Sequence, residues 1–302
     1  MVKRLIVNAD DFGLTVGVNR AILESHNGGI VSSATLMAGG AQFDDAVRAA
    51  RSVPTLSVGC HVVLVDGAPV STPQTVDTLL AIRSSEPEKF FSRLSAFSAR
   101  AMLGGFDRDQ LVGEIVAQIK KVQAAGLEVT HLDTHKHAHV LPEILWALIR
   151  AAKVCGIPAI RNPFVPVKAM NAKLFKDKRS IWKRYGQARM LHTFSRRFRQ
   201  QTKRAGLVTP DGLLGMIETG ALESAGYSDL MRQTLASLPD GTWEFVCHPG
   251  YNDAELKSAG TRLLESRDEE RRLLSSTALR EFLDEQKIAV IGYREFVKSS
   301  GM

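Results

Sequence analysis

The sequence lacks any long hydrophobic run. None of the 302 residues belongs to a stretch that stays apolar for the roughly 20 positions a membrane-spanning helix needs. The first residues, MVKRLIVNADDFG, pass from a short apolar run directly into acidic residues, without the longer apolar region and cleavage site of a signal peptide. We therefore expect a cytoplasmic protein, with at most a peripheral contact to the inner membrane.

Cysteine is scarce. Cys60, Cys155 and Cys247 are odd in number, far apart and each placed in an apolar run. Disulfide frameworks and zinc clusters need paired or closely spaced cysteines, so we expect three buried free thiols. The sequence also has no Gly-x-Gly-x-x-Gly turn after its first predicted strand, no Gly-x-Ser-x-Gly elbow and no P-loop. It therefore gives no support to a dinucleotide-binding enzyme, a serine hydrolase of that type or a P-loop NTPase.

Acidic residues are nearly absent from one segment, residues 168–204. It has about thirteen Lys and Arg and one acid, Asp177, whereas the whole chain has a net charge of +7. The rest of the chain is therefore mildly acidic, and the basic character is a local feature that bears on partners.

Short β-type runs alternate with longer helical patterns along the chain. Predicted strands cover residues 4–11, 33–37, 56–64, 129–134, 159–162, 213–218, 242–248 and 288–291. Predicted helices cover residues 16–26, 44–51, 107–125, 141–155, 227–238 and 266–286. Such alternation predicts an α/β fold of parallel strands covered by helices, either a barrel or an open doubly wound sheet. We expect one domain over residues 1–302, with an irregular excursion at 65–106 and a basic, helical one at 167–208.

Notable polar residues fall at the ends of predicted strands. Asp10 and Asp11 end the first strand, His61 lies late in the third, Asp133 ends the fourth and His248 ends the seventh. In a parallel barrel all carboxyl ends open on one face, where catalytic groups collect. Residues remote in sequence could therefore converge on one pocket.

The adjacent carboxylates of Asp10 and Asp11 would repel each other if both were buried without a partner. A cation would remove that cost. Neighbouring strand residues point in opposite directions, but at a strand end the chain can turn both toward one site. The alternative is a pair of acids at a helix N-terminus.

The segment HLDTHKHAH at 131–139 has four histidines in nine residues. If the strand continued through it, His131, Asp133, His135, His137 and His139 would share one face. Such clusters are typical of metal-binding or catalytic sites, and Asp133 is placed to orient a histidine that binds the ion. The alternative is a solvated polar loop.

Two further histidines could have a structural role in place of a functional one. His61 lies inside an apolar run and could be a hydrogen-bonded core residue. His248 precedes Pro and Gly, so it could be an ordinary turn residue, or a general acid because its pKa lies near neutrality. One Asp and two His ligands would leave room for water on a metal ion, an arrangement that supports hydrolysis.

Four motifs carry a family resemblance. NADDFG at 8–13, VGCH at 58–61, THLDTHKHAH at 130–139 and CHPG at 247–250 resemble, in order and spacing, those of the YdjC-like carbohydrate deacetylases, with similarity from residue 3 to about residue 295. The resemblance implies a distorted TIM-like (β/α) barrel. It also implies a hydrolase that removes N-acetyl groups from amino sugars.

The resemblance further implies roles for individual residues. Asp11, His61 and His135 would bind one divalent metal ion, zinc or magnesium. Asp10 would be the general base, and His248 an acid or an oxyanion-stabilising partner. Surrounding or substrate-binding positions would be Asp133, His137, Arg161 and Tyr251. Lys136 stands where many members of the family have another histidine, which leaves the role of that position open.

Two further segments, VLVDGAPV at 63–70 and TPDGLLGMIETGAL at 209–222, resemble the hopanoid-biosynthesis branch of the family. That branch implies N-acetylglucosaminyl-bacteriohopanetetrol, a lipid-linked amino sugar, as substrate. Aromatic residues interleave with the basic residues of 168–204, a pattern that suits an anionic membrane surface. The alternative is a charged helix packed on the barrel.

Other functions remain to be weighed. They are a deacetylase of soluble chito-oligosaccharides, a non-catalytic carbohydrate- or membrane-binding protein on the same fold, and a metal-dependent phosphoesterase, which would normally need more carboxylate ligands. A nucleic-acid partner fits the predicted catalytic cluster badly. A homodimer is compatible with the sequence, which does not determine the oligomeric state.

Overall fold

Seven parallel strands form the centre of the molecule. The computed structural model describes residues 2–81, 88–165, 192–215 and 224–301. The strands are β1 (Lys3–Phe12), β2 (Ser33–Leu36), β3 (Ser57–Val62), β4 (Leu132–Thr134), β5 (Gly212–Leu214), β6 (Gly241–Cys247) and β7 (Ile288–Val290). Their order is β4-β3-β2-β1-β6-β5, and β7 pairs with the start of β1. All pairings are parallel, as the alternation of elements predicts.

The sheet curls, and irregular backbone bridges its two edges. Leu132 at the β4 edge donates its N–H to the carbonyl of Ala159 at 3.0 Å, and Leu213 of β5 donates to the carbonyl of Phe164, also at 3.0 Å. The segment between them was predicted as a strand over 159–162, but it forms only isolated bridges. Pro158 and Pro163 flank it and have no N–H for a ladder. The architecture is the expected distorted TIM-like barrel.

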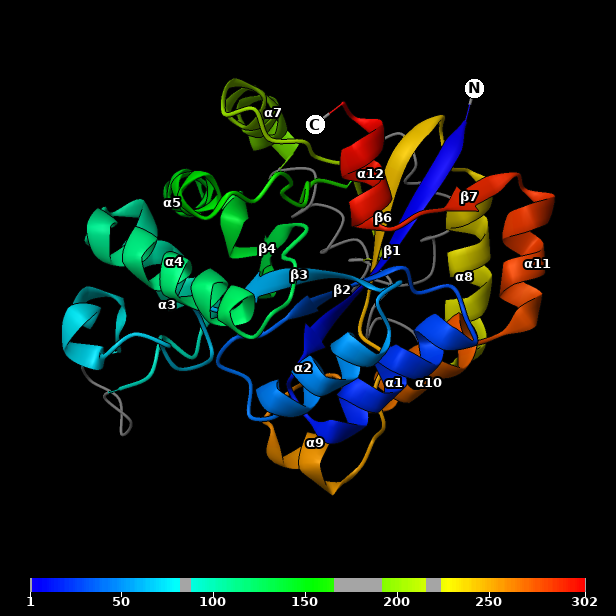
Figure 1. Ribbon diagram of the computed structural model, residues 1–302, viewed down its shortest axis with the longest axis horizontal. Coiled ribbons are helices and arrows are strands. Elements are labelled where there is room, and N and C mark those ends of the chain that lie inside the picture. The colour runs from blue at the N-terminus through cyan, green and yellow to red at the C-terminus, as the bar shows by residue number, and fades with distance from the viewer. Residues whose placement is uncertain (1, 82–87, 166–191, 216–223, 302) are drawn as a thin grey trace.

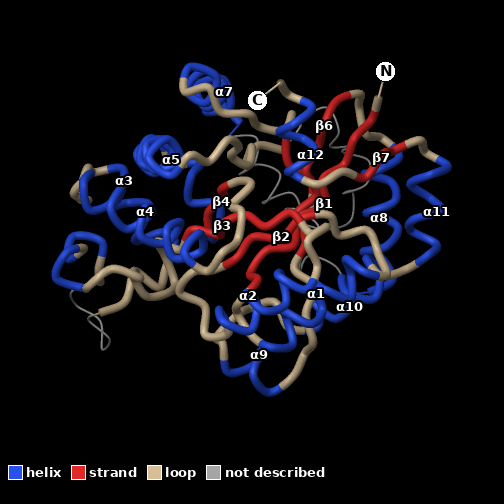
Figure 2. The backbone as a smooth tube through the Cα atoms, viewed as in Figure 1, coloured by secondary structure: helices blue, strands red, loops and turns tan. Residues whose placement is uncertain are grey.

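Helices surround the sheet (Figures 1 and 2). The α-helices are α1 (Val16–Asn27), α2 (Phe43–Ser52), α3 (Leu94–Met102), α4 (Arg108–Ala124), α5 (Pro142–Cys155), α7 (Ser195–Arg204), α8 (Ser224–Ala236), α9 (Ala254–Ser258), α10 (Glu265–Leu274), α11 (Thr277–Glu285) and α12 (Tyr293–Ser299). Short 3-10 turns are η1 (Pro73–Thr75), η2 (Asp77–Leu79), η3 (His135–Val140) and η5 (His192–Phe194). Helices α3, α4 and α5 lie on the β4 side of the sheet, whereas α8 and α11 lie on the opposite side (Figure 1).

Local sequence explains where the well-predicted helices begin and end. The Asp107 carboxylate accepts the N–H groups of Asp109 and Gln110, both at 2.9 Å, and so caps α4. Helix α5 begins at Pro142 and ends before Gly156, whose φ of 70° suits glycine. The predicted apolar face of α4, Leu111, Ile115, Ile119 and Val122, is fully buried.

Other elements differ from the prediction. The helix expected over 266–286 is two helices, α10 and α11, because the chain turns at Ser275 and Ser276, and Ser276 is the N-terminal flanking residue of α11. The excursion at 65–106 contains α3 and two short turns in its described part. Helices α9 and α12 were not predicted. In the basic excursion, residues 167–191 lie outside the described residues, and so do 216–218 of the predicted strand 213–218.

The barrel interior has an apolar floor and polar contents above it. Ile6, Ala159, Tyr293 and Phe296 form an apolar cluster separate from the main core. Further along β1, Asn8 and Asp10 follow Ile6 at alternate positions, so the same face of the strand becomes polar toward its carboxyl end. Helix α12 therefore contributes Tyr293 and Phe296 to the floor, and the strand ends above it are left for a site.

The cysteines and the helix lengths bear on two expectations from the composition. Cys60, Cys155 and Cys247 are buried free thiols, as expected. Within the described ranges, no helix has both the length and the apolar character needed to cross a membrane.

Candidate metal centre

The end of β1 is bent so that two consecutive carboxylates are buried at the site. Asp11 has a φ of 64°, in the left-handed region, and the pairing of β1 with β2 shifts register between Ala9 and Phe12. Such a bulge re-aims side chains that strict alternation would place on opposite faces. Asp10 is 2% exposed and Asp11 4%. The expected turn of both acids toward one site is present.

Asp11 Oδ1 lies beside two histidine nitrogens from other strand ends. It is 3.5 Å from His61 Nε2 and 3.5 Å from His135 Nδ1, and the two nitrogens are 3.3 Å apart. His61 belongs to β3, and His135 directly follows β4. The structure thus brings together the three residues that the sequence marks as metal ligands.

These spacings fit a small divalent ion. Tetrahedral ligands at about 2.0–2.1 Å from zinc lie roughly 3.4 Å from one another, which matches all three measured separations. Asp11 Oδ1 is buried and accepts no hydrogen bond within the described part of the chain. A buried carboxylate oxygen without a donor is costly, so the arrangement favours a cation there.

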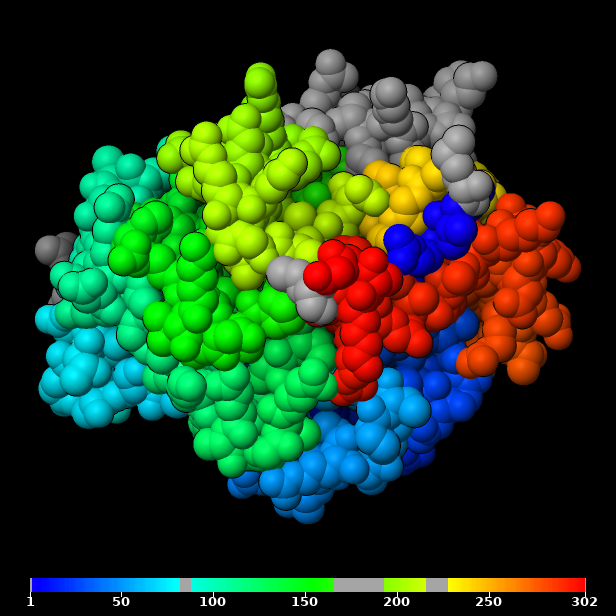
Figure 3. Space-filling model, turned by 45° about the horizontal axis from the view of Figure 1, so that its top comes forward, coloured from blue at the N-terminus to red at the C-terminus, as the bar shows by residue number. Residues whose placement is uncertain are grey.

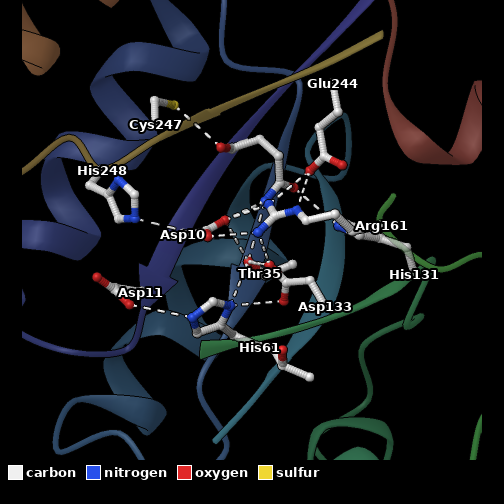
Figure 4. Close-up of polar contacts among 12 residues, drawn as sticks. Asp10, Asp11, Thr35, His61, His131, Asp133, Arg161, Glu244, Cys247 and His248 are labelled. Carbon is white, nitrogen blue, oxygen red and sulfur yellow. Dashed lines mark hydrogen bonds and ion pairs between the residues drawn. The ribbon is translucent and has the colours of Figure 1, made fainter. Parts of the chain in front are cut away.

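A buried carboxylate orients the ring of His61. His61 Nδ1 lies 2.8 Å from Asp133 Oδ1, which fixes the ring so that Nε2 is directed toward Asp11 (Figure 4). Burial opposes a charged His61, but Asp133, Asp10 and Asp11 outweigh it and raise its pKa to about 9. The position therefore favours positive charge even without a metal ion.

Asp11 has a second partner that the sequence analysis missed. Arg267 of α10, itself buried, donates from Nη2 to Asp11 Oδ2 at 2.5 Å. Burial raises the pKa of Asp11, but Arg267 and His135 outweigh it and hold the pKa well below its usual range. Arg267 neutralises one oxygen and leaves Oδ1 for an ion. Its neighbours in the sequence are charged helix-surface residues, so no local signal distinguishes it.

A second group of acids, Asp10, His61 and Asp133, also has metal-like spacing. Here the cation is already present. Arg161, fully buried, donates from Nη1 to Asp10 Oδ2 at 2.7 Å and from Nη2 to Asp10 Oδ1 at 2.6 Å, and it pairs through Nη1 with Asp133 (Figure 4). Burial raises the pKa of Asp10, but Arg161 outweighs it and holds that pKa far below its usual range. This group is therefore already neutralised by an arginine.

Arg161 meets three carboxylates inside the protein. Beyond the contacts to Asp10 and Asp133, its Nε donates to Glu244 Oε1 at 2.8 Å, and Nη2 lies 2.7 Å from the same oxygen. Three hydrogen bonds and two further ion-pair contacts thus join its guanidinium to three carboxylates. Of the two roles expected for Arg161, the structure favours support of the site over contact with a substrate.

His248 follows β6 and completes the group around Asp10. Its Nε2 lies 3.9 Å from Asp10 Oδ2, and its backbone N–H donates to Glu270. Burial lowers the pKa of His248 to about 4, against the opposing effect of Asp11 and Asp10. The ring is therefore neutral at pH 7, and its Nδ1 has no hydrogen-bond partner among the residues described.

The prediction that alternate residues of 131–139 share one face is wrong beyond Thr134. β4 ends there, and Lys136 and His137 take left-handed φ angles of 54° and 53° in η3. The two flanking histidines are structural. His131 lies 3.1 Å from Asn8 Oδ1, and buried His139 lies between Thr134 Oγ1 and the Arg161 carbonyl.

His137 also lies beside the site, where Arg161, Asp10 and His248 influence its charge. Burial holds its pKa well below the usual value, and its Nδ1 makes no hydrogen bond to the described residues.

Left-handed backbone at Asp11, Asp66, Lys136 and His137 costs about 1–2 kcal/mol per residue. Asp11 is the penultimate residue of β1, the other three lie after β3 or β4, and Lys136 Nζ pairs with Asp66 at 2.5 Å. Strain of this kind is typical of functional sites.

Tyr251, expected near the substrate, has its contacts elsewhere. Its hydroxyl donates to Glu24 Oε2 at 2.6 Å, and its ring lies between the guanidinium groups of Arg20 and Arg271, each 4.4 Å from the ring centroid. These partners do not belong to the metal-like cluster.

Three supporting residues escaped the sequence analysis besides Arg267. Thr35 of β2 donates to Asp10 or Asp133, each at 3.2 Å, and Glu244 of β6 binds Arg161. Gly59 leaves room for a neighbour, since a Cβ there would lie 2.5 Å from the His131 ring. Only Glu244 had a usable signal, because it is an acid within an otherwise apolar strand, WEFVC.

Comparison with known proteins identifies close relatives. The family model described as "YdjC-like protein" matches residues 4–285. A carbohydrate deacetylase from Brevibacillus brevis is 32% identical over 97% of this chain and 99% of its own length, and one from Thermoanaerobacter pseudethanolicus is 30% identical over 97% and 98%. The crystal structure of a putative cellobiose-phosphate cleavage protein from Enterococcus faecalis has the same fold, with a TM-score of 0.75, 24% identity, and coverage of 98% of this chain and 99% of that one.

Proposed function

This chain belongs to the YdjC-like protein family, and on that premise we propose that it is a metal-dependent carbohydrate deacetylase, which hydrolyses the N-acetyl group of an amino sugar. The named relatives are carbohydrate deacetylases over nearly their whole length, which supports amide hydrolysis as the activity. The relatives' names do not specify a metal ion or the roles of individual residues, so these parts of the proposal rest on the geometry of the site.

One observation carries the proposal. Asp11 Oδ1, His61 Nε2 and His135 Nδ1 lie 3.3–3.5 Å from one another, and the carboxylate oxygen has no described hydrogen-bond donor. Three protein ligands leave space for water and a substrate oxygen. When bound, the divalent ion lowers the pKa of water and polarises the amide carbonyl. Two imidazole nitrogens suit zinc better than magnesium, which prefers oxygen ligands.

Asp10 and His248 are the proposed acid–base pair. The low pKa values of both groups leave them unprotonated at pH 7. Asp10 accepts a proton from the attacking water, and a proton must then reach the departing amine nitrogen. His248, with Nε2 3.9 Å from Asp10 Oδ2, takes up that proton and donates it. The water proton thus ends on the amine, and the products are acetate and a free amino sugar.

The test is acetate release from N-acetylated glucosamine oligosaccharides, with the chain first stripped by chelator and then reloaded with zinc, magnesium or no metal. We expect release only after reloading, with zinc more effective than magnesium. Metal-independent release would contradict the metal site. A complete lack of release from every acetylated substrate would favour a non-catalytic carbohydrate-binding protein.

A lipid-linked substrate, N-acetylglucosaminyl-bacteriohopanetetrol in the narrowest form, is the finer part of the proposal. It is supported by the described end of the basic segment. Helix α7 buries Phe198 and Thr202, whereas its five basic residues are exposed and its sequence contains no acid. The exposed basic residues are Arg196, Arg197, Arg199, Lys203 and Arg204. Figure 3 shows α7 in yellow-green on the outer surface. Such a face suits anionic lipid headgroups.

Charge reversal of this face separates the two substrate classes. Substitution of Arg196, Arg197 and Arg199 by Glu should lower turnover of a glycolipid in anionic vesicles and leave turnover of a soluble chito-oligosaccharide unchanged. Equal turnover of the glycolipid by the wild type and by this triple variant would instead favour a deacetylase of soluble chito-oligosaccharides.

A further inference from the structure

A buried polar connection runs from the proposed base to the floor of the barrel. Glu244 of β6 is level with Ile6 in the sheet register, four residues before Asp10 on β1, and is fully buried. Its Oε1 accepts a hydrogen bond from Arg161 Nε at 2.8 Å, while Nη1 and Nη2 of the same guanidinium donate to the two oxygens of Asp10 (Figure 4). Glu244 therefore contacts the far side of the group that holds Asp10.

Tyr293, the first residue of α12, is the next link. Its hydroxyl donates to Glu244 Oε2 at 2.6 Å, and its N–H donates to Ser33 Oγ at 3.1 Å. Its ring stacks on His131, with centroids 3.6 Å apart and planes 8° from parallel. His131 in turn lies 3.1 Å from Asn8, whose amide donates to Asp10 Oδ1 at 2.9 Å. Two paths thus join Tyr293 to Asp10.

We propose that Glu244 and Tyr293 are positioning residues for the reaction, which set the orientation and basicity of Asp10 through Arg161. The inference rests on the proposed function, because it takes Asp10 as the base. Neither residue reaches the metal ligands, and both are buried, so they act only through Arg161 and Asn8.

The physical reason lies in the shared guanidinium. A planar fork that must satisfy Glu244 at one edge and Asp10 at the other has one orientation that serves both. Negative charge on Glu244 also offsets part of the Arg161 charge that Asp10 experiences, so it raises the affinity of Asp10 for a proton. Among the described residues, Arg161, Tyr293 and Asp10 have the largest electrostatic effects on Glu244, and the Cys247 thiol on the same strand is also within its influence.

Burial raises the pKa of Glu244 to about 7, against the opposing effects of Arg161 and the Tyr293 hydroxyl. Ionisation of Glu244 should therefore make Asp10 a better base, and kcat should rise as pH passes through about 7. This inflection is a signature that a purely structural role would not produce.

The experiment compares Glu244→Gln and Tyr293→Phe with the wild-type chain, each zinc-loaded, in acetate release from an N-acetylated glucosamine disaccharide across roughly pH 5–9, a range that includes the pKa of about 7 of Glu244. Metal content, KM and thermal unfolding are measured alongside. Thr202→Val is the matched control, because it removes another buried hydroxyl, one that bonds within α7 to the Phe198 carbonyl at 3.1 Å.

We expect kcat to fall roughly tenfold in both variants with KM and metal content unchanged. Glu244→Gln should lose the inflection, and Tyr293→Phe should move it to higher pH, because the lost donor had favoured ionised Glu244. Thr202→Val should keep it in place.

Wild-type kcat and pH profile in Glu244→Gln, after correction for the folded fraction, would overturn the inference, and this variant decides alone if Tyr293→Phe does not fold. An active wild type with unaffected variants overturns only the inference. A wild type that releases no acetate overturns the proposed function with it.

Discussion

Two clusters of acidic residues in the barrel interior both include a contact to His61, and they differ in which group balances their negative charge. In the first, which we call the closed cluster, Asp10, Asp133 and Glu244 surround Arg161, which makes three hydrogen bonds and two further ion-pair contacts to them. In the second, the open cluster, Asp11 meets His61 and His135, and Asp11 Oδ1 has no donor in the described structure.

The difference shows how similar residue types are given different tasks. A protein cation with fixed geometry makes the closed cluster a rigid support, since the guanidinium fixes the orientation of the carboxylates around it. The open cluster keeps one unsatisfied oxygen and two ring nitrogens, which is the requirement for an exchangeable ion. Asp10 and Asp11 are adjacent in the chain, yet the bulge at the end of β1 assigns one to each cluster.

The largest effect is expected from breaking the open cluster. Asp11→Ala removes a ligand and leaves Arg267 without its partner, so metal content should be lost and kcat should fall roughly 10³-fold or more. Metal analysis of the dialysed protein and acetate release measure both. Retention of one bound ion per chain would show that Asp11 is not a ligand.

The proposed base is tested by a change that spares the metal. Asp10→Asn keeps the shape of the side chain but removes its basicity, so kcat should fall about 10²–10³-fold. Metal content should stay at the wild-type level, in contrast to Asp11→Ala. An Asp10→Asn enzyme of normal activity would refute the assignment of Asp10.

The closed cluster should matter most for stability. Arg161→Met leaves three buried carboxylates without their cation, which should lower the free energy of unfolding by about 3–5 kcal/mol. Arg294→Met, which breaks a surface pair with Glu128, should cost no more than about 1 kcal/mol. Denaturant unfolding gives both values, and similar losses in the two variants would argue against the closed cluster as a rigid support.

The smallest effect is a pH dependence of stability that arises in the closed cluster. The pKa of Glu244 is raised to about 7 in the folded chain, above its ordinary value. The folded state therefore holds a proton that the unfolded state has released. This contribution to stability is complete below about pH 4 and is lost as pH rises to about 7, with a slope of at most about 1.4 kcal/mol per pH unit.

Comparison with Glu244→Gln isolates that contribution, because Asp10 and Asp11, whose pKa values are lowered, act in the opposite direction at acid pH. The free energy of unfolding of the wild type should fall, relative to the variant, between about pH 4 and pH 7. Parallel curves for the two proteins would show that Glu244 titrates normally.

Much of this architecture could be read from local patterns. Short apolar runs located β1, β3 and β6, and the helices predicted over 107–125 and 141–155 correspond to α4 and α5. The local patterns failed where backbone geometry departs from its local preference. Nothing in HLDTHKHAH signalled that Lys136 and His137 would turn left-handed, so the strand was extended too far.

The residue types at the strand ends are evident from the linear sequence: adjacent acids near the end of β1, a histidine late in β3, and a histidine-rich segment that runs through β4 and beyond it. These residue types carry their ligand and proton affinities wherever they stand. Which acid lies at the candidate ion site and which one pairs with an arginine depends on the fold. Arg161, Glu244, Arg267 and Tyr293 come from four separate parts of the chain, and their roles arise from distances that a linear pattern does not contain.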